Sequence, residues 1–460
     1  MRKKPWPKSQ NTTPPRSLRE WQTLPFPYVA TAFTTCSIVK TADANGSAPM
    51  ETAPPKSSPR WAFNAMAAAL LLSAGCVSQT VPKSPAATPS PFYLGADIST
   101  LPDVERNGGV YMDGNKPGDA LAIFMKNGWT CFRARIWVNP SNGVNGLEYT
   151  TQLAKRIKNA GGTFMLDFHY SDWWADPQKQ HKPAAWSNLD FNALVQQTES
   201  YTANVIRTLK RAGATPDFVQ IGNEITGGLL WPDAQVQVPP SKVKVFSGEV
   251  KAITPPQPYD DARQWGHLIR VLKAAAAGVR SAATPEDRVR IIVHIDCGGD
   301  WPVTRWYFDH LTRAGVDFDV IGQSYYPNWH GAIENLRDNL RETVRRYHKD
   351  LMVVETAYPS RQTHPAPAAA KNMIWPQTPE GQKQFLADII QAVRQAPEGH
   401  GVGVNYWHPE ATYFPRRPRG WMARPDANSL FDATGRPLPA MKVLGLQAGA
   451  TNSMALSRHP

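Results

Sequence analysis

Short apolar segments recur throughout residues 92–445, and most of them are followed by a stretch with helical periodicity. The segments are nearly continuous apolar runs, a pattern typical of strands that are buried on both faces of a parallel sheet. We predict strands at residues 92–99, 130–138, 163–170, 217–224, 290–296, 318–327, 351–358 and 401–409. We predict amphipathic helices at residues 152–159, 191–211, 262–282, 303–313, 333–347 and 380–395.

Eight strand–helix units in about 350 residues predict an α/β fold of the (β/α)8 TIM-barrel type. Several glycines stand just before predicted strands, where helices commonly end. They are Gly128, Gly161, Gly162, Gly213 and Gly315. The alternative is an open doubly wound sheet, which calls for a glycine-rich phosphate-binding turn after its first strand. The first strand here runs into Asp-Ile-Ser-Thr-Leu-Pro at 97–102 instead, so the barrel is favoured.

Two glutamates end the fourth and seventh predicted strands, Glu224 and Glu355. The active site of a (β/α)8 barrel lies at the carboxyl ends of its strands, so these side chains can converge over the barrel mouth. One protonated and one ionised carboxyl group are the groups that cleave a glycosidic bond. Arg133 and Arg135 lie two apart on one face of the second strand, and either can hold Glu355 ionised and oriented.

Other polar and aromatic residues at the strand ends suit a sugar ligand. Asn223 can donate to a sugar 2-hydroxyl, and aromatic rings stack on the C–H faces of sugars. The candidate substrate-binding residues are Asp97, Arg133, Arg135, His169, Asp172, Trp173, Asn223, His294, Tyr325, Trp329 and Trp407. Taken singly, each also has a structural explanation as an ion-pair partner or a core side chain. Their joint occurrence at the strand ends favours a site.

A metal-dependent hydrolase is the alternative chemistry for this set. His169, His294 and Asp296 could mimic a barrel amidohydrolase. Those enzymes need a His-x-His pair on the first strand, where this chain has Gly95-Ala-Asp97. We therefore predict neither a metal nor another cofactor.

Composition and charge exclude several classes of protein. An apolar fraction of 42% excludes a chain that is disordered throughout, and four cysteines exclude a disulfide-stapled scaffold. Cys131 and Cys297 fall in or beside predicted strands and are expected to be buried small apolar side chains. The net charge is +12, but residues 1–90 hold ten Lys or Arg against three Asp or Glu. Most of the excess therefore precedes the barrel, and nucleic-acid binding is not expected.

The region before the barrel reads as an export signal and a tether. Residues 1–60 are rich in Pro, Ser, Thr and basic side chains and are predicted to be unstructured. A short apolar stretch then leads into Leu72-Ser-Ala-Gly-Cys76, which resembles a bacterial lipobox. We expect lipidation of Cys76 and anchoring in the bacterial cell envelope, with Met50 as the true start. An ordinary signal peptide with secretion, or a short buried helix, is the alternative.

The predicted organisation of the chain has four parts. Residues 1–76 form the leader and signal segment, 77–91 a Pro/Ser/Thr-rich linker, 92–445 the barrel domain and 446–460 a C-terminal tail. Valine rather than aspartate follows Cys76, which by resemblance to bacterial lipoproteins points to the outer membrane. No apolar run reaches the ~18–20 residues that span a bilayer, so contact with a membrane is expected only through the lipid.

The strand-end motifs are similar to those of glycoside hydrolase family 53, the arabinogalactan endo-β-1,4-galactanases. The most specific are His-Tyr-Ser-Asp-Trp-Trp-Ala-Asp-Pro at 169–177 and Gly-Asn-Glu-Ile-Thr at 222–226. Further matches lie at 95–102, 133–140, 230–232, 319–327 and 354–359, and the resemblance covers nearly all of 92–432. It implies a retaining mechanism with Glu224 as acid/base and Glu355 as nucleophile. Their carboxyl groups should then lie about 5–5.5 Å apart.

Three features depart from the family pattern. The family usually has Tyr-Trp-Glu-Pro on the eighth strand, where this chain has His408 and carries Glu410 two residues later. This change affects subsite contacts rather than the catalytic pair. The loop 233–261 is long and is expected to reshape the cleft. Some members bind calcium in the last loop, but residues 409–431 hold only Glu410 and Asp426 as acids, so no calcium is expected.

The resemblance implies endo-hydrolysis of β-1,4-galactan, a pectin side chain, by an enzyme that we expect to be a monomer. Another retaining β-glycanase of the same clan is one alternative. A surface lipoprotein that binds glycans without cleaving them is another, although the intact Glu224, Glu355 and Asn223 speak against it.

Overall fold

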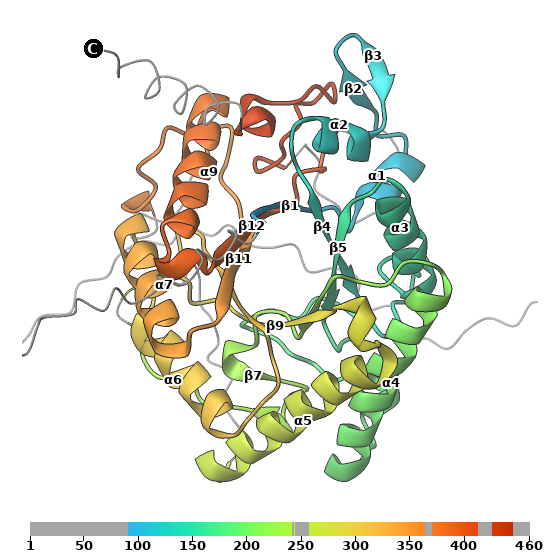
Figure 1. Cartoon of the computed structure of the whole chain (residues 1–460), viewed down its shortest axis with the longest axis vertical. Helices are drawn as coiled ribbons and strands as arrows, with labels where there is room; N and C mark the ends of the chain where they lie inside the picture. Colours follow the sequence, from blue (N-terminus) through green and yellow to red (C-terminus); the bar gives the residue numbers. More distant parts are fainter. Residues whose placement is uncertain (1–90, 242, 244–256, 364–369, 413–425, 445–460) are drawn as a thin grey trace, which may run out of the picture. The chain divides into compact units, whose positions relative to one another are not determined.

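Eight parallel strands close into a barrel in the computed structural model of the chain, and helices surround the barrel on the outside (Figure 1). The order around the barrel is β1-β12-β11-β10-β9-β6-β5-β4, so β12 closes onto β1. The strand bounds are Tyr93–Asp97 (β1), Cys131–Ile136 (β4), Thr163–Phe168 (β5), Phe218–Ile221 (β6), Arg290–Ile295 (β9), Val320–Ser324 (β10), Asp350–Thr356 (β11) and Gly401–Trp407 (β12). The predicted (β/α)8 fold is confirmed, and the open doubly wound sheet is excluded.

The structure describes residues 91–241, 243, 257–363, 370–412 and 426–444. The leader with Met50 and Cys76, nearly all of the linker, the tail and the middle of the loop 233–261 lie outside these ranges. The predictions made for those segments stay predictions. Within the described ranges, no helix is long and apolar enough to cross a membrane.

Each predicted helix is present on the outside of the barrel. The α-helices are Leu101–Arg106 (α1), Ala120–Lys126 (α2), Leu147–Asn159 (α3), Phe191–Arg211 (α4), Asp261–Ala282 (α5), Trp301–Arg313 (α6), Ile333–Tyr347 (α7) and Pro379–Arg394 (α9). The side chains of Asp190, Asp260 and Asp300 cap the amino termini of α4, α5 and α6 by accepting a backbone N–H three residues on. Gly213 and Gly315 follow α4 and α6 with positive φ, as expected for the residue just past a helix end.

Short elements were missed by the periodicity. They are α1 and α2, the hairpin of Tyr111–Asp113 (β2) with Lys116–Gly118 (β3), and the pair Gly228–Leu229 (β7) with Ala234–Gln235 (β8). Short 3-10 turns lie at Ala184–Trp186, Ile225–Gly227, Pro285–Asp287, Pro397–Gly399 and Pro439–Lys442. None of these spans enough residues to establish a hydrophobic period. Helix α3 also begins five residues before its predicted start at 152, because Thr150 and Thr151 interrupt the apolar pattern of its first turns.

The barrel interior has an apolar floor and a polar upper layer. The floor is built from residues in the first half or middle of the strands: Cys131, Met165, Phe218, Ile292, Val320, Met352, Val354 and Val402. Cys131 and Cys297 are buried thiols, as predicted. Because side chains alternate along a strand, Cys131, Arg133 and Arg135 share the inward face of β4. The inward residues nearer the strand ends are therefore polar, and they position the site.

Candidate active site

Glu224 follows β6 at the barrel mouth in a left-handed backbone conformation, with φ 50° and ψ 48°. A non-glycine residue rarely adopts this conformation, which costs of order 1–3 kcal/mol and persists where surrounding structure fixes it. The Glu224 backbone N–H donates to Nδ1 of His294 at 3.3 Å, and its carboxyl Oε1 accepts from the Ser324 hydroxyl at 2.6 Å. The residue is thus held through its backbone and through its carboxyl group, and it is 9% exposed.

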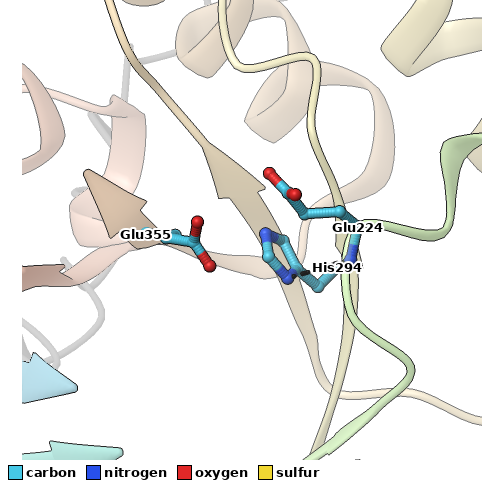
Figure 2. Close-up of side chains that lie close together, drawn as sticks. All are labelled: Glu224, His294 and Glu355. Atoms are coloured by element: carbon cyan, nitrogen blue, oxygen red, sulfur yellow. Dashed lines mark hydrogen bonds between the residues drawn. The ribbon is translucent and has the colours of Figure 1, made fainter. Parts of the chain in front are cut away.

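Glu355 lies on β11 and is 8% exposed. Its Oε1 accepts from the Tyr326 hydroxyl at 2.9 Å, and its Oε2 pairs with Nη1 of Arg133 at 3.2 Å. Figure 2 shows the Glu355 and Glu224 side chains reaching toward a common space, with the His294 ring between them. One carboxyl oxygen of each glutamate and one ring nitrogen of His294 all lie within 4.8 Å of one another. The structure therefore brings the two glutamates together, and we call them the carboxylate pair.

Arg133 connects the groups beneath the carboxylate pair. Its guanidinium lies 2.8 Å from Asp97 and 2.9 Å from Asp167, and it donates to Oδ1 of Asn223 at 2.7 Å. Burial opposes ionisation of Asp97 and Asp167, but the nearby arginines outweigh it and lower the pKa of both carboxyl groups. A planar, permanently charged group can thus hold several buried anions in place at once.

The two members of the carboxylate pair have unequal surroundings. Burial raises the pKa of Glu224 well above its ordinary value, and the negative charges of Glu355 and Asp296 raise it further. Burial also raises the pKa of Glu355, but Arg133 and the Tyr326 hydroxyl act against the rise. Glu224 is therefore the group that keeps its proton, and Glu355 is the one whose ionised form is stabilised.

His169 and His294 are buried and hydrogen bonded through both ring nitrogens. Burial lowers the pKa of each, so both rings are neutral. Ala175 N–H donates to Nδ1 of His169 at 2.9 Å, and its Nε2 lies 3.2 Å from Asp167. His294 is engaged by Glu224 N–H and by Ser324. With both ring nitrogens in use, His294 has no lone pair directed at the carboxylate pair for a metal ion. Among the described residues, His169, His294 and Asp296 do not gather into a metal-ligating cluster.

Tyr325 does not reach the barrel mouth, which corrects the sequence prediction. It is wholly buried, and its hydroxyl donates to the Gly331 carbonyl at 3.0 Å. Neighbouring residues of an extended chain point to opposite faces, so Ser324 and Tyr326 face the site instead. The substrate contacts predicted for Asp97, Arg135 and His169 stay predictions. All three are buried supports of other site residues.

The aromatic candidates lie at or just after the ends of three strands. Trp173 and Trp329 follow β5 and β10 and are 54% and 37% exposed. Trp407 ends β12 and is half-buried beside His408. Asp172 accepts the backbone N–H groups of Asn139 and Ala184 at 3.0 and 2.8 Å, and so joins the loops after β4 and β5.

Sequence reasoning missed four residues of the site. Gln220 donates to Asp167 and to Nδ1 of His294. Trp174 lies under the Arg135 guanidinium at 4.1 Å from its ring centroid. Ser324 and Tyr326 contact the carboxylate pair. The period of two could have found Ser324 and Tyr326, since Ser324 ends β10 on its inward face and Tyr326 follows two residues later. Nothing in the local sequence indicated which of two adjacent tryptophans packs on Arg135.

His408 and Glu410 take different partners after β12. His408 Nδ1 lies 2.9 Å from Asp426. Burial opposes the charged ring, but Asp426 and Glu410 outweigh it, so the pKa of His408 is raised. Glu410 is buried and accepts the backbone N–H of Thr100 at 3.0 Å. Asp426 and Glu410, the two acids of the last loop, therefore contact His408 and Thr100. Residues 413–425 of this loop lie outside the described ranges.

The family model for glycosyl hydrolase family 53 matches residues 93–444. The chain belongs to this family. A Niallia circulans protein described as uncharacterised is 38% identical over 380 residues, 80% of this chain and 97% of the relative. An arabinogalactan endo-β-1,4-galactanase of Thermothelomyces thermophilus is 31% identical over 367 residues, 76% of this chain and 98% of the relative. The family 53 catalytic domain of Ignisphaera aggregans matches with a TM-score of 0.67 and 32% identity, over 78% of this chain and 97% of that domain.

Proposed function

We propose that this family 53 chain cleaves β-1,4-galactosidic linkages inside type I arabinogalactan with retention of configuration. The observation that carries the proposal is the carboxylate pair, in which burial keeps a proton on Glu224 while Arg133 and Tyr326 stabilise ionised Glu355. The relative from Thermothelomyces thermophilus, named for this activity and matched over 98% of its length, supports the choice of galactan.

In the first step, Glu224 donates its proton to the oxygen of the leaving sugar as the glycosidic bond breaks. A carboxylate oxygen of Glu355 attacks the anomeric carbon from the opposite face and forms a glycosyl ester. The hydrogen bonds from Arg133 and Tyr326 keep Glu355 aimed at that carbon. Glu224 becomes negatively charged when it loses its proton. It then faces no second negative charge, because the Glu355 carboxylate has become a neutral ester.

In the second step, Glu224 acts as base. It takes a proton from a water molecule whose oxygen attacks the anomeric carbon, and the bond to Glu355 breaks to regenerate its carboxylate. Two inversions give net retention. Asn223 lies beside the pair with Oδ1 held by Arg133 and one amide hydrogen held by the Ala175 carbonyl at 2.8 Å. Its second amide hydrogen is the donor proposed for the sugar 2-hydroxyl, a bond that strengthens in the transition state.

Measuring reducing-end release from linear β-1,4-galactan tests this function. Wild-type protein should release galacto-oligosaccharides, and the Glu355→Gln variant should be inactive while folding normally. A matched control is Glu334→Gln, an exposed α7 glutamate that should leave activity unchanged. Activity on mannan or xylan without activity on galactan would contradict the substrate assignment. Galactan binding by a wild-type protein that releases no sugar would favour the non-catalytic lipoprotein.

We also propose export and lipid anchoring through Cys76. The support is the sequence alone: basic residues, a short apolar stretch and Leu72-Ser-Ala-Gly before the cysteine. Metabolic labelling with a radioactive fatty acid in a bacterial host should label the wild-type chain, and a Cys76→Ala variant should lose the label. An unlabelled wild-type chain recovered in the medium would favour ordinary secretion.

A further inference from the structure

A chain of hydrogen bonds links three barrel strands to one oxygen of Glu224. Nδ1 of His294, on β9, receives the Glu224 backbone N–H at 3.3 Å and the Gln220 amide at 3.0 Å. Nε2 of His294 lies 2.8 Å from the hydroxyl oxygen of Ser324, at the end of β10. That hydroxyl lies 2.6 Å from Oε1 of Glu224. Every group in this chain is buried.

The direction of each hydrogen bond in the chain is fixed. A backbone N–H can only donate, so Nδ1 of His294 accepts and the ring carries its hydrogen on Nε2. This holds whichever way the Gln220 amide is turned. Because Nε2–H donates to the Ser324 oxygen, the serine hydrogen is left to point at Oε1 of Glu224. The ring stays neutral because its burial lowers the pKa.

We propose that His294 and Ser324 act as positioning residues that confine the catalytic proton of Glu224 to Oε2. Oε1 already accepts the hydrogen of the Ser324 hydroxyl. A proton bound to Oε1 would point at that hydrogen and be repelled by it. The proton therefore sits on Oε2, the oxygen left to face the leaving group. After transfer, the serine hydrogen bond stabilises the carboxylate until water returns a proton. No proton moves through His294 or Ser324 in either step.

This inference rests on the proposed acid/base role of Glu224, and leaving-group dependence tests it. The substrates are β-1,4-galactan, whose leaving sugar needs a proton, and a 2,4-dinitrophenyl β-1,4-galactobioside, whose leaving group does not. Ser324→Ala should lower kcat/KM on galactan by about 10- to 100-fold, part of the ~10²–10⁴-fold effect of a whole general acid. On the dinitrophenyl substrate, kcat/KM should change by less than about threefold, because departure of the dinitrophenyl group needs no acid. The basic limb of the galactan pH profile should move to higher pH, because a donor to ionised Glu224 is gone.

Three further variants separate positioning from a purely structural role. Ser324→Thr keeps a hydroxyl and should restore most of the activity on galactan. Thr202→Val removes another buried hydroxyl, which lies on α4 and contacts Tyr170. This variant should leave kcat/KM unchanged on both substrates. His294→Asn can still accept the Glu224 N–H but is too short to reach Ser324. It should give the same leaving-group-dependent loss and serves as the test if Ser324→Ala does not fold.

An equal loss of kcat/KM on both substrates with an unmoved basic limb, in folded Ser324→Ala or His294→Asn, would overturn the positioning role. Failure of the proposed function is a separate result. It would appear as wild-type protein that leaves galactan intact, whereas failure of the positioning role appears as an active wild type whose variants lose the same factor on both substrates.

Discussion

The Tyr326 hydroxyl, just after the adjacent strand β10, donates to Oε1 of Glu355 at 2.9 Å. Burial and the charge of Glu355 raise the pKa of Tyr326 well above its ordinary value, so the hydroxyl stays protonated and can only donate to this carboxylate at neutral pH. The nucleophile of the proposed mechanism thus has a neutral donor on one oxygen and the Arg133 cation on the other.

Replacing Tyr326 with Phe should lower kcat/KM on galactan by about 10- to 100-fold, since a hydrogen bond to a charged group contributes roughly 1.5–3 kcal/mol. The acidic limb of the pH profile should move to higher pH, because a group that lowers the pKa of Glu355 has been removed. Tyr325→Phe is the matched control, since its hydroxyl contacts the Gly331 carbonyl. Equal losses in the two variants would show that Tyr326 acts only through packing.

The pH profile of kcat/KM should be bell-shaped. Glu355 must be ionised, so activity falls as the pH drops through its pKa. Glu224 must be protonated, so activity falls as the pH rises through its own, more strongly raised pKa. On the dinitrophenyl substrate, whose leaving group needs no proton, the basic limb should be absent from kcat/KM in wild type and in Glu224→Gln alike, while the acidic limb remains. A basic limb that persists in this variant would assign it to another group.

Arg133→Met should destabilise the fold by about 3–5 kcal/mol, because it leaves the carboxylates of Asp97, Asp167 and Glu355 buried without their shared cation. Chemical denaturation measures the loss. Arg345→Met, which removes an exposed arginine on α7, should stay within about 0.5 kcal/mol of wild type. A similarly small change in the free energy of unfolding for Arg133→Met would contradict this account. It would mean that protonation or hydration of the three carboxylates replaces the arginine with no loss of stability.

The His408–Asp426 pair should make stability depend on pH. The folded-state pKa of His408 is raised, so its contribution is fully present below the unfolded value of about 6.5 and is lost as the pH rises through the folded value. Thermal denaturation across this range should show the loss in wild type but not in His408→Gln. His408→Glu, which restores the residue common in the family, should be less stable than His408→Gln because it sets a second carboxylate against Asp426. Equal stability of the two variants at neutral pH would contradict this.

The barrel could be predicted because its strands are buried on both faces and its helices are long enough to show a period. Residue types at strand ends then indicated Glu224 and Glu355, since parallel strands bring their carboxyl ends to one edge. Side-chain partners were harder. The predicted strand runs to 327, three residues past the end of β10 at Ser324, and an error of one residue exchanges the two faces.

Contacts between strands distant in sequence left no local signal. The hydrogen bond from Ser324 to Glu224 joins residues 100 positions apart, and its direction depends on the tautomer of a third residue, His294. The pairing of His408 with Asp426 likewise follows from how the chain returns after β12. Composition and spacing could suggest such residues only as members of a set.

Covalent trapping tests the central claim most directly. A 2-deoxy-2-fluoro β-1,4-galactobiosyl fluoride should inactivate the enzyme, since the 2-fluorine slows both steps while the fluoride leaving group keeps formation of the glycosyl ester faster than its hydrolysis. Peptide mass spectrometry should then place one sugar adduct on Glu355. An adduct on Glu224 or on any other residue, or products released first as the α-anomer from β-galactan, would contradict the account.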